Sequence, residues 1–559
     1  MSLDAFRQEL ATPRTSIQLC ALGIIGGVCA ASVIILFRLS VEWLQLMYLE
    51  EVNDFTSLSA PERLIMPIIG VLLILCVAYL TGFKHYRMGI PFVIHRVKQR
   101  FGHIPFRTTI NQFFGGAFAL ASGFSVGREG PSVHLGAAGS SFFGQWLKLP
   151  HNSIRILSGC GIAAGISASF NTPFAAVIFV MEVVLREYKI HIFIPIMLAA
   201  ACGTVMTRAV FGQAQEIDFI EFFEFSRWIY LYLILFGILL GGLATLFNNA
   251  LMKVMYMFQR FNMIKRLLIA ACITGAVGYV LPQALGAHFF SVHDMVLQQQ
   301  NVMLLVAVLC AKFFITIIAI GLGIPGGIMG PVFVLGMLSG ALLAAPLGLA
   351  LDNMEQLSGS FALLGMAGLM TSVVHAPLAA LSAVMELSYS PELILPAILV
   401  IVPAYVTSTQ FLGNSSIFIR QLDYQKLPYS TSSVLEALQK TGVLAVMDKE
   451  FKLFNNAQQH HILQFLETSP THPVVQRNSV EIDVQYALVQ YDISLSREES
   501  SLAFFTMQGV SFQSTLAEVY QILQSSREGA VYVYENEPSN ITGVITWNML
   551  RSYLHKAQY

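Results

Sequence analysis

The sequence carries little charge for its length. Asp, Glu, Lys and Arg make up 12% of the 559 residues, whereas hydrophobic residues make up 55%. A soluble domain of average composition has about 25% charged residues, so the composition excludes an ordinary soluble protein. The formal net charge of −1 also lacks the basic excess that binding to nucleic acid requires, and we expect no nucleic-acid partner.

Signatures of metal, redox and enzymatic chemistry are missing as well. The seven cysteines lie in apolar runs without a CxxC pair, which is typical of small core residues rather than metal ligands. No GxxxxGK[ST] loop is present, which excludes an ATP-driven pump of that type. An intramembrane hydrolase would need a nucleophile and a base, but Ser158 and Cys160 lack a GxSG-type turn. We therefore expect no enzyme, no metal and no cofactor.

What the chain has instead is long apolar runs. Several are long enough to cross a hydrocarbon core of about 30 Å, and the sequence predicts ten or more membrane helices in an all-α, multi-pass protein of the lipid bilayer. Examples of these runs are Ser16–Phe37, Leu64–Leu80, Trp228–Phe247, Leu267–Leu281, Val302–Leu322 and Leu393–Val406. The first run is too long for a signal peptide, so we expect an uncleaved first span. The basic segment His95–Arg107 predicts a cytoplasmic loop.

The composition changes near residue 428. Charged residues return, and short alternating runs such as "GAVYVYE" and "ITGVITW" predict strands beside helical stretches. We expect a membrane domain over 1–427 and a soluble, cytoplasmic α/β domain over 428–559. The last part of this tail resembles a cystathionine-β-synthase (CBS) domain, and the stretch around "HILQFLETSPTHPVVQ" resembles a degenerate first copy. Nucleotide-binding copies carry an Asp where this chain has Asn548, so we expect no adenine nucleotide to bind.

Two segments of the membrane region occur twice. "TPFAAVIFVME" (Thr172–Glu182) returns as "APLAALSAVME" (Ala376–Glu386), with the proline, both alanines and the glutamate at the same spacing. Some 45 residues earlier, "GFSVGREGPSVHLG" is matched by "GLGIPGGIMGPVFVLG", in which Gly127 and Gly130 correspond to Gly327 and Gly330. The membrane region is therefore predicted to consist of two related halves.

Gly- and Pro-interrupted segments at matching positions of two halves point to a transport site between them. Helix N-termini expose unpaired N–H groups and about +0.5 charge, so Gly-rich helix openings at membrane depth favour an anion. Three such openings are present: "MGIP" (Met88–Pro91), "GREGP" (Gly127–Pro131) and "GIMGP" (Gly327–Pro331). A small anion is the substrate that this pattern predicts.

With these motifs the chain resembles the CLC family of chloride channels and proton/chloride exchangers. The family's anion-site motifs, GSGIP, GREGP and GxFxP, are matched by the three segments above, and "SSIFIRQL" (Ser415–Leu422) matches the stretch that carries an anion-coordinating tyrosine. The resemblance implies an inverted-repeat CLC-type fold and a homodimer with one pore in each subunit. It also implies a multi-pass protein of the cell (inner) membrane.

Carried over residue by residue, the resemblance implies that Glu129 is the gate. Its carboxylate would compete with chloride and leave the pathway when a proton binds. The resemblance further implies an anion site formed by Met88, Gly89, Ile90, Gly130, Ile328, Met329 and Phe418. In this chain Met88 replaces the family's serine, and Phe418 replaces its tyrosine, so two hydroxyl donors are missing.

One departure bears on the mechanism. Exchangers of the family carry a second, intracellular glutamate where this chain has Val183. We therefore expect passive, Glu129-gated chloride conduction, with a proton-coupled chloride or fluoride antiporter as the alternative. Glu182, the preceding residue, either lines a proton pathway or holds its helix by hydrogen bonds, as its repeat partner Glu386 would.

Overall fold

The computed structural model describes residues 3–14, 16–83, 89–212, 227–286, 302–348, 354–429, 433–455, 457–469, 472–480, 483–491 and 502–557. The chain forms two compact units. Unit 1 contains Met1–Leu19, Gly144–Arg155 and Ser430–Tyr559, and unit 2 contains Cys20–Phe143 and Ile156–Tyr429.

Unit 2 is helical throughout its described part, as the apolar runs predict. Ten helices among the described residues are long and apolar enough to span a membrane, in agreement with the ten or more expected. The helices that lie wholly or mostly in this unit are α2 (Ile17–Leu46), α3 (Ala60–Leu80), α4 (Gly89–Gln99), α5 (Phe106–Ala121), α6 (Glu129–Trp146), α7 (His151–Phe170), α8 (Pro173–Phe179), η1 (Val180–Leu185), α9 (Ile190–Phe211), α10 (Arg227–Met257), α11 (Met263–Val280), η2 (Pro282–Ala284), α13 (Val302–Leu322), α14 (Met329–Gly348), α15 (Met354–Val374), α16 (Pro377–Ser388), η4 (Pro391–Leu393), α17 (Ile394–Val406), η5 (Thr407–Phe411) and α18 (Ile417–Tyr424).

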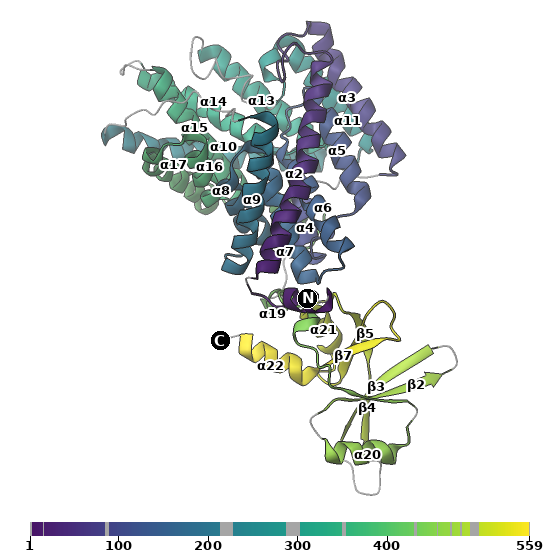
Figure 1. The fold of residues 1–559 in the computed structure, drawn as a ribbon. Coiled ribbons are helices and arrows are strands. Elements are labelled where there is room, and N and C mark those ends of the chain that lie inside the picture. The colour runs from purple at the N-terminus through teal and green to yellow at the C-terminus, as the bar shows by residue number, and fades with distance from the viewer. Residues whose placement is uncertain are drawn as a thin grey trace. The chain divides into compact units, whose positions relative to one another are not determined.

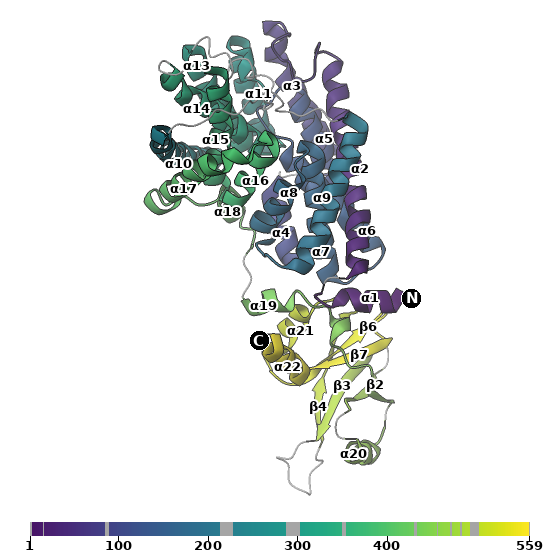
Figure 2. The same ribbon diagram turned by 60° about the vertical axis from the view of Figure 1, so that its left-hand side comes forward.

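The two halves pack corresponding helices against each other in the same way. Figure 1 shows α11 of the second half next to α3 of the first, against which it packs, and Figure 2 shows α2 to α9 beside α10 and α13 to α18. In the first half α6 crosses α7 where Gly136 meets the carbonyl of Gly161, and in the second half α14 crosses α15 where Gly336 meets that of Gly365. A side chain at these crossings would strike backbone, since a Cβ on Gly336 would lie 2.6 Å from the carbonyl oxygen of Gly365. Small residues thus let the paired helices approach closely, as in other membrane bundles.

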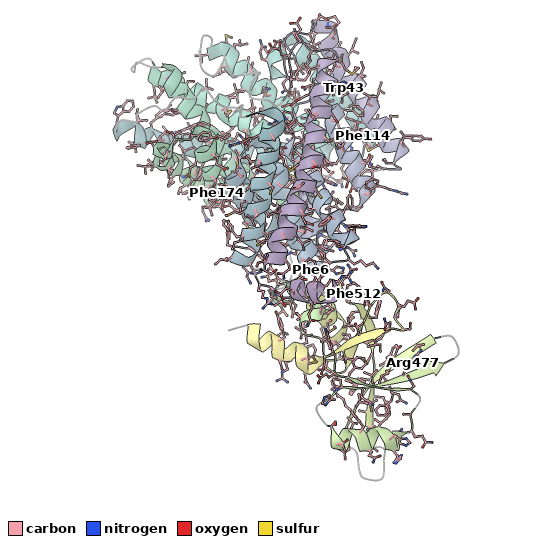
Figure 3. The ribbon with its side chains drawn as sticks, viewed as in Figure 1. Phe6, Trp43, Phe114, Phe174, Arg477 and Phe512 are labelled. Carbon is pink, nitrogen blue, oxygen red and sulfur yellow. The ribbon has the colours of Figure 1, made fainter. Side chains whose placement is uncertain are left out.

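Large apolar side chains cover the periphery of unit 2. Trp43, Phe114 and Phe174 are 64%, 45% and 45% exposed, and Figure 3 shows them at the margins of the helical unit. In water such a surface would be unfavourable, whereas hydrocarbon chains accept it. The exposed apolar surface therefore fits a bilayer environment.

Unit 1 is an α/β unit with two small sheets. One sheet has the order β1-β2-β3-β4 and the other β5-β6-β7; the first pair of each sheet is parallel and the remaining pairs are antiparallel. The elements are α1 (Leu3–Ala11), α19 (Ser433–Leu438), η6 (Val443–Ala445), β1 (Lys452–Asn455), α20 (Gln459–Thr468), β2 (Val474–Val480), β3 (Asp483–Tyr491), β4 (Leu502–Thr506), β5 (Gln508–Ser511), α21 (Leu516–Leu523), β6 (Ala530–Tyr534), β7 (Ile541–Thr546) and α22 (Trp547–Ala557). The strands and helices predicted for the tail are present.

Two stretches from elsewhere in the sequence complete unit 1. The Nδ2 of Asn152 donates to the carbonyl oxygens of Leu10 and Ala11 at 3.0 and 3.2 Å. Gln513 donates through Nε2 to the carbonyl of Leu149 at 3.0 Å. Helix α1 and the α6–α7 connection are thus hydrogen-bonded parts of the α/β unit. The boundary at 427/428 and the pair of CBS-like modules stay predictions.

Candidate functional site

The two Gly-rich openings of the two halves meet in unit 2. The N–H of Gly127 donates to the carbonyl of Gly327 at 2.8 Å, and the N–H of Gly327 donates back to Gly127 at 2.6 Å. Two residues after each glycine a helix begins, α6 at Glu129 and α14 at Met329. This reciprocal bridge therefore brings the N-terminal ends of two long helices to one point, where their dipoles favour negative charge.

A third helix opens beside the bridge. Helix α4 begins at Gly89, whose φ of +78° is a conformation that residues other than glycine rarely adopt. A Cβ on Gly89 would lie 3.8 Å from the carbonyl oxygen of Gly326, so the start of α4 is a neighbour of the bridge. Met88 lies outside the described residues.

The carboxylate of Glu129 lies over the bridge itself. Its side chain is buried, with 2% of the residue exposed. A Cβ on Gly327 would lie 2.5 Å from its Oε2, and a Cβ on Gly330 would lie 2.8 Å from its Oε1. Glycine at these positions leaves room for the carboxylate, which sits among helix openings of both halves.

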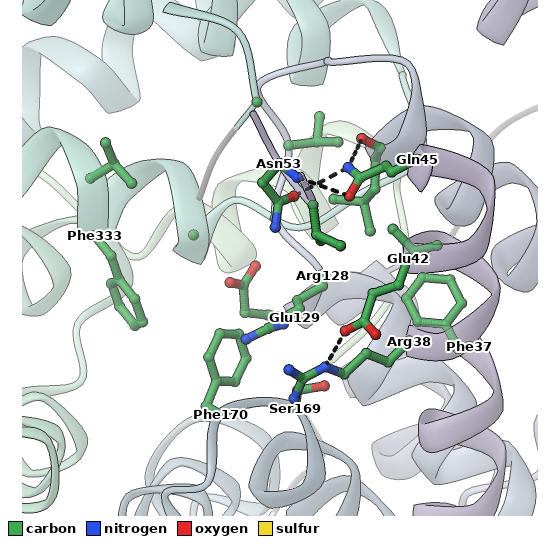
Figure 4. A pocket seen from close by; sticks show the side chains of 18 of the residues that line it. Phe37, Arg38, Glu42, Gln45, Asn53, Arg128, Glu129, Ser169, Phe170 and Phe333 are labelled. Atoms are coloured by element: carbon green, nitrogen blue, oxygen red, sulfur yellow. Dashed lines mark hydrogen bonds and ion pairs between the residues drawn. The ribbon is translucent and has the colours of Figure 1, made fainter. Parts of the chain in front are cut away.

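Two cavities are lined by neighbouring residues at the crossing of the helix openings, that is, at the Gly127–Gly327 bridge and the helix starts beside it. Pocket 1, of about 410 Å³, is lined by Gly127, Arg128, Glu129 and Gly330, together with residues of α2 that include Arg38 and Glu42 (Figure 4). Pocket 2, of about 810 Å³, reaches Gly130. The crossing with Glu129 thus lies where the two cavities approach each other.

Pocket 2 gathers most of the residues predicted for the anion site. Gly89, Ile90, Gly130, Ile328 and Phe418 all line it, although they come from four helix openings spread over some 330 residues. Met329, the first residue of α14, is buried at 5% exposure.

The charge of pocket 2 suits an anion. Arg260, Arg266 and Lys426 line it, and no carboxylate stands among its described lining residues. A cavity lined by charges of one sign concentrates ions of the opposite sign. Sequence reasoning missed these cations, because Arg260 and Lys426 lie outside the helices and Arg266 lies in the first turn of α11, and only the fold brings the three to one cavity.

Glu182 and Glu386 make reciprocal contacts. The carboxylate of Glu182, in the π-helical turn η1, accepts the N–H groups of Leu378 and Ala379 at 3.2 and 2.9 Å. The carboxylate of Glu386 accepts those of Phe174 and Ala175 at 2.8 and 2.7 Å. Glu182 thus caps α16 in the second half, and Glu386 caps α8 in the first half. These contacts favour the second interpretation of Glu182, in which it holds its helix.

Lys312 is a buried cation that the sequence analysis did not single out. Its Nζ donates to the carbonyl oxygens of Ala284, Leu285 and Gly286 at 3.3, 3.3 and 3.0 Å. Gly286 lines pocket 1, so Lys312 holds part of that cavity's wall. The signal was present in the repeat, since "KFF" at Lys312 stands 200 positions after "QFF" at Gln112, the same offset that separates Gly127 from Gly327.

Fold and site together define a class: a membrane protein of two related halves whose helix openings converge on an anion-favouring crossing between two cavities. The family model described as "Voltage gated chloride channel" matches residues 69–409. The chain belongs to this CLC family, whose members are channels and transporters rather than enzymes, and it has the CLC-type fold for anion transport.

Individual relatives agree with this assignment. The H+/Cl− exchange transporter ClcA of Salmonella agona is 28% identical over 434 residues, covering 74% of this chain and 90% of that protein. A slow cyanobacterial Cl−/H+ antiporter has a TM-score of 0.62 at 23% identity over 73% of this chain and 96% of its own. A eukaryotic CLC transporter has a TM-score of 0.59 at 19% identity over 95% of this chain and 97% of its own. A CLC-type fluoride/proton antiporter has a TM-score of 0.60 at 25% identity over 72% of this chain and 96% of its own.

Proposed function

We propose that the protein exchanges chloride for protons across a membrane. The observation that carries this proposal is the position of the Glu129 carboxylate, buried on the Gly127–Gly327 bridge where pockets 1 and 2 approach each other. A carboxylate there occupies the place that the helix openings favour for an anion. Proton binding neutralises it and frees that place for chloride, so one site serves both ions in turn.

The anion in our proposal is bound by the helix openings around this crossing. The N–H groups of Gly89, Ile90, Gly130, Ile328 and Met329 are the proposed donors. Met88 and Phe418 contribute a thioether and a ring in place of hydroxyls. Backbone dipoles carry only partial charges, and they bind an anion weakly enough to release it.

The choice between exchange and passive conduction rests on the relatives. ClcA of Salmonella agona is named as an H+/Cl− exchange transporter, and a structural neighbour at 25% identity is described as a fluoride/proton antiporter. These similarities support the coupled alternative over the channel that the sequence analysis preferred. The observation in favour of a channel is Val183, which is apolar and 5% exposed. Passive chloride conduction is therefore the second candidate.

A transport assay in liposomes separates the two. Under an outward chloride gradient without a pH gradient, an exchanger drives protons uphill, and Glu129→Gln abolishes that movement. A channel instead gives a reversal potential at the chloride Nernst value that an imposed pH step does not shift, and this result would overturn the exchange proposal. Measuring chloride and fluoride side by side identifies the preferred anion.

We also propose the setting of this activity. The positive segment His95–Arg107 supports a cytoplasmic position for that loop, and we place the α/β unit on the same side of the cell (inner) membrane. The proposed assembly is a homodimer with one pathway per subunit. We propose no nucleotide ligand for the tail, because Asn548 stands in place of an aspartate.

A further inference from the structure

Pocket 1 has a wall that the internal repeat does not account for. Arg38, Glu42 and Gln45 line it from α2, at spacings of three and four residues that place them on one helical face. Helix α2 precedes the first repeated segment. This wall is therefore an addition to the crossing of helix openings, and it brings its own charges to the cavity.

The guanidinium of Arg38 is held in place within the pocket. Its Nε donates to Oε1 of Glu42 at 2.8 Å, and both side chains are 25% exposed. Its central carbon lies 4.0 Å from the ring centroid of Phe211, a cation–π arrangement. The ion pair with Glu42 uses the Nε–H of Arg38, and the ring of Phe211 covers one face of its guanidinium. The two terminal amino groups of Arg38 therefore keep a defined orientation. A fixed guanidinium is a better anion ligand than a mobile one.

A second arginine faces the same cavity. Arg128 lines pocket 1 next to Glu129, with its guanidinium carbon 4.8 Å from the ring centroid of Phe170. Figure 4 shows the two guanidinium groups, Glu42 and the Glu129 carboxylate around the same opening. The aromatic rings of Phe211 and Phe170 thus each hold one guanidinium group of the pocket lining.

The charge of this lining depends on the state of the gate. Among the lining residues that the structure describes, the ionisable side chains are Arg38, Arg128, Glu42 and Glu129. With both carboxylates ionised the charges cancel, whereas a proton on Glu129 leaves one positive charge in excess. The attraction of pocket 1 for an anion therefore rises at the moment when the crossing becomes free to receive one.

We propose that pocket 1 contains an anion-capture subsite in which Arg38 and Arg128 hold a small monovalent anion before it enters the position that Glu129 occupies. Glu42 is a positioning residue in this subsite, because it orients Arg38 and offsets its charge. The inference rests on the proposed function, since a captured anion matters only to a protein that transports it. A weak second site along the pathway also suits rapid transport, which requires several weak sites rather than one strong one.

The test varies chloride on one side of a planar bilayer at a time. Arg38→Gln is expected to raise the half-saturating chloride concentration about three- to fivefold, the range expected for losing one partly exposed charge. Glu42→Gln keeps a hydrogen-bond acceptor for Arg38 but removes the opposing charge, and should lower that concentration. Both shifts are expected on one side of the membrane only. Arg63, which donates to the carbonyl of Thr56 at 2.9 Å outside the pocket, supplies the control Arg63→Gln.

The two variants are expected to shift the half-saturating chloride concentration in opposite directions, and this difference decides the test. Both variants lose the same ion pair, so a merely structural role for Arg38 and Glu42 would shift chloride dependence in one direction in both. That result, or no shift in either, would overturn the subsite while leaving chloride transport intact. If Arg38→Gln fails to fold, Arg38→Lys keeps the charge but loses the fixed guanidinium fork, so its half-saturating chloride concentration should also rise above that of the wild type, while Glu42→Gln still tests the sign. A wild type that moves no chloride contradicts the proposed function instead.

Discussion

A buried carboxylate in a membrane interior is costly unless its surroundings favour negative charge. Glu129 meets this condition because the openings of α6 and α14 converge on it through the Gly127–Gly327 bridge. In the proposed function, the same surroundings favour chloride once the carboxylate is neutral. The proposed competition between the side chain and the substrate then follows from the location of Glu129.

Replacing Glu129 by Gln tests that competition. Because the amide carries no charge, anion flux should rise severalfold, and its dependence on pH between about 4.5 and 7.5 should flatten. The wild type should be activated by acid for the same reason. Chloride efflux from liposomes measures both. An unchanged flux and pH profile in the variant would remove Glu129 from the gate.

The pair Glu182 and Glu386 offers a matched test of capping. Replacing either one by Ala removes a carboxylate from two N–H groups at a helix N-terminus, which should lower stability by about 1 kcal/mol in both cases. Thermal unfolding of the purified protein measures this loss. Equal losses of stability in the two Ala variants, with proton-coupled chloride transport retained, support capping. The variants Glu182→Gln and Glu386→Gln test the alternative: loss of proton coupling in Glu182→Gln alone would place Glu182 on a proton pathway.

At the scale of elements, the site depends on how closely helix openings approach each other. A Cβ on Gly130 would lie 2.6 Å from the carbonyl oxygen of Gly326 and 2.8 Å from the N of Gly327. Gly130→Ala should therefore push the two openings apart and reduce flux about tenfold or more, since an overlap of this size costs on the order of 1–3 kcal/mol.

Gly242→Ala is the matched control for that substitution. Gly242 lies within α10, and apart from the adjoining backbone of its own helix no described atom would lie within 4 Å of an added Cβ. Alanine favours a helix by about 1 kcal/mol over glycine, so this variant should transport normally and unfold at the same or a slightly higher temperature. Equal flux in the two variants would show that close approach at the bridge is unnecessary.

The start of helix α21 makes the α/β unit sensitive to acid. Glu518 accepts the N–H of Thr515 at 2.8 Å and lies 3.3 Å from Nδ1 of His151. Burial raises the pKa of Glu518, but the hydrogen bond and charge of His151, with bonds from Thr515 and Ser514, outweigh it and leave the pKa below its usual range. A lowered pKa stabilises the fold above the unfolded value of about 4.3, and this contribution is lost as pH falls through the folded pKa.

Glu518→Gln should therefore destabilise the α/β unit near neutral pH by about 1 kcal/mol, the usual range for a helix cap. It should also flatten the acid limb of the stability curve below about pH 4.5. Calorimetry of the full chain across this pH range checks both effects. A variant that keeps the acid limb of the wild type would assign the acid sensitivity to other groups.

At the scale of the whole molecule, the sequence of the tail resembles a CBS domain, and Asn548 stands where nucleotide-binding copies carry an aspartate. ATP at millimolar concentration should therefore change neither chloride flux nor the unfolding temperature. Asn548→Asp is the matched variant, and a response to ATP only in that variant would trace the difference to this position. A saturable rise of several degrees in the wild type would contradict our interpretation of Asn548.

The sequence by itself determined the membrane class, the two related halves and the positions of the helix openings. Apolar runs, the spacing of glycine and proline, and repeated motifs are local patterns. They can be recognised in the sequence without knowledge of the fold. Glu129 and the residues of the proposed anion site were predicted for the same reason, because each belongs to a short motif.

Only the tertiary structure decided which side chains share a cavity. The cations of pocket 2, the contact of Lys312 with three carbonyls and the orientation of Arg38 all join segments distant in the chain. Glu182 illustrates the difference: its repeat motif predicted a partner in Glu386, but the fold revealed that each caps the other half's helix. Hydrogen bonds and charge pairs act through space, and no spacing along the chain encodes them.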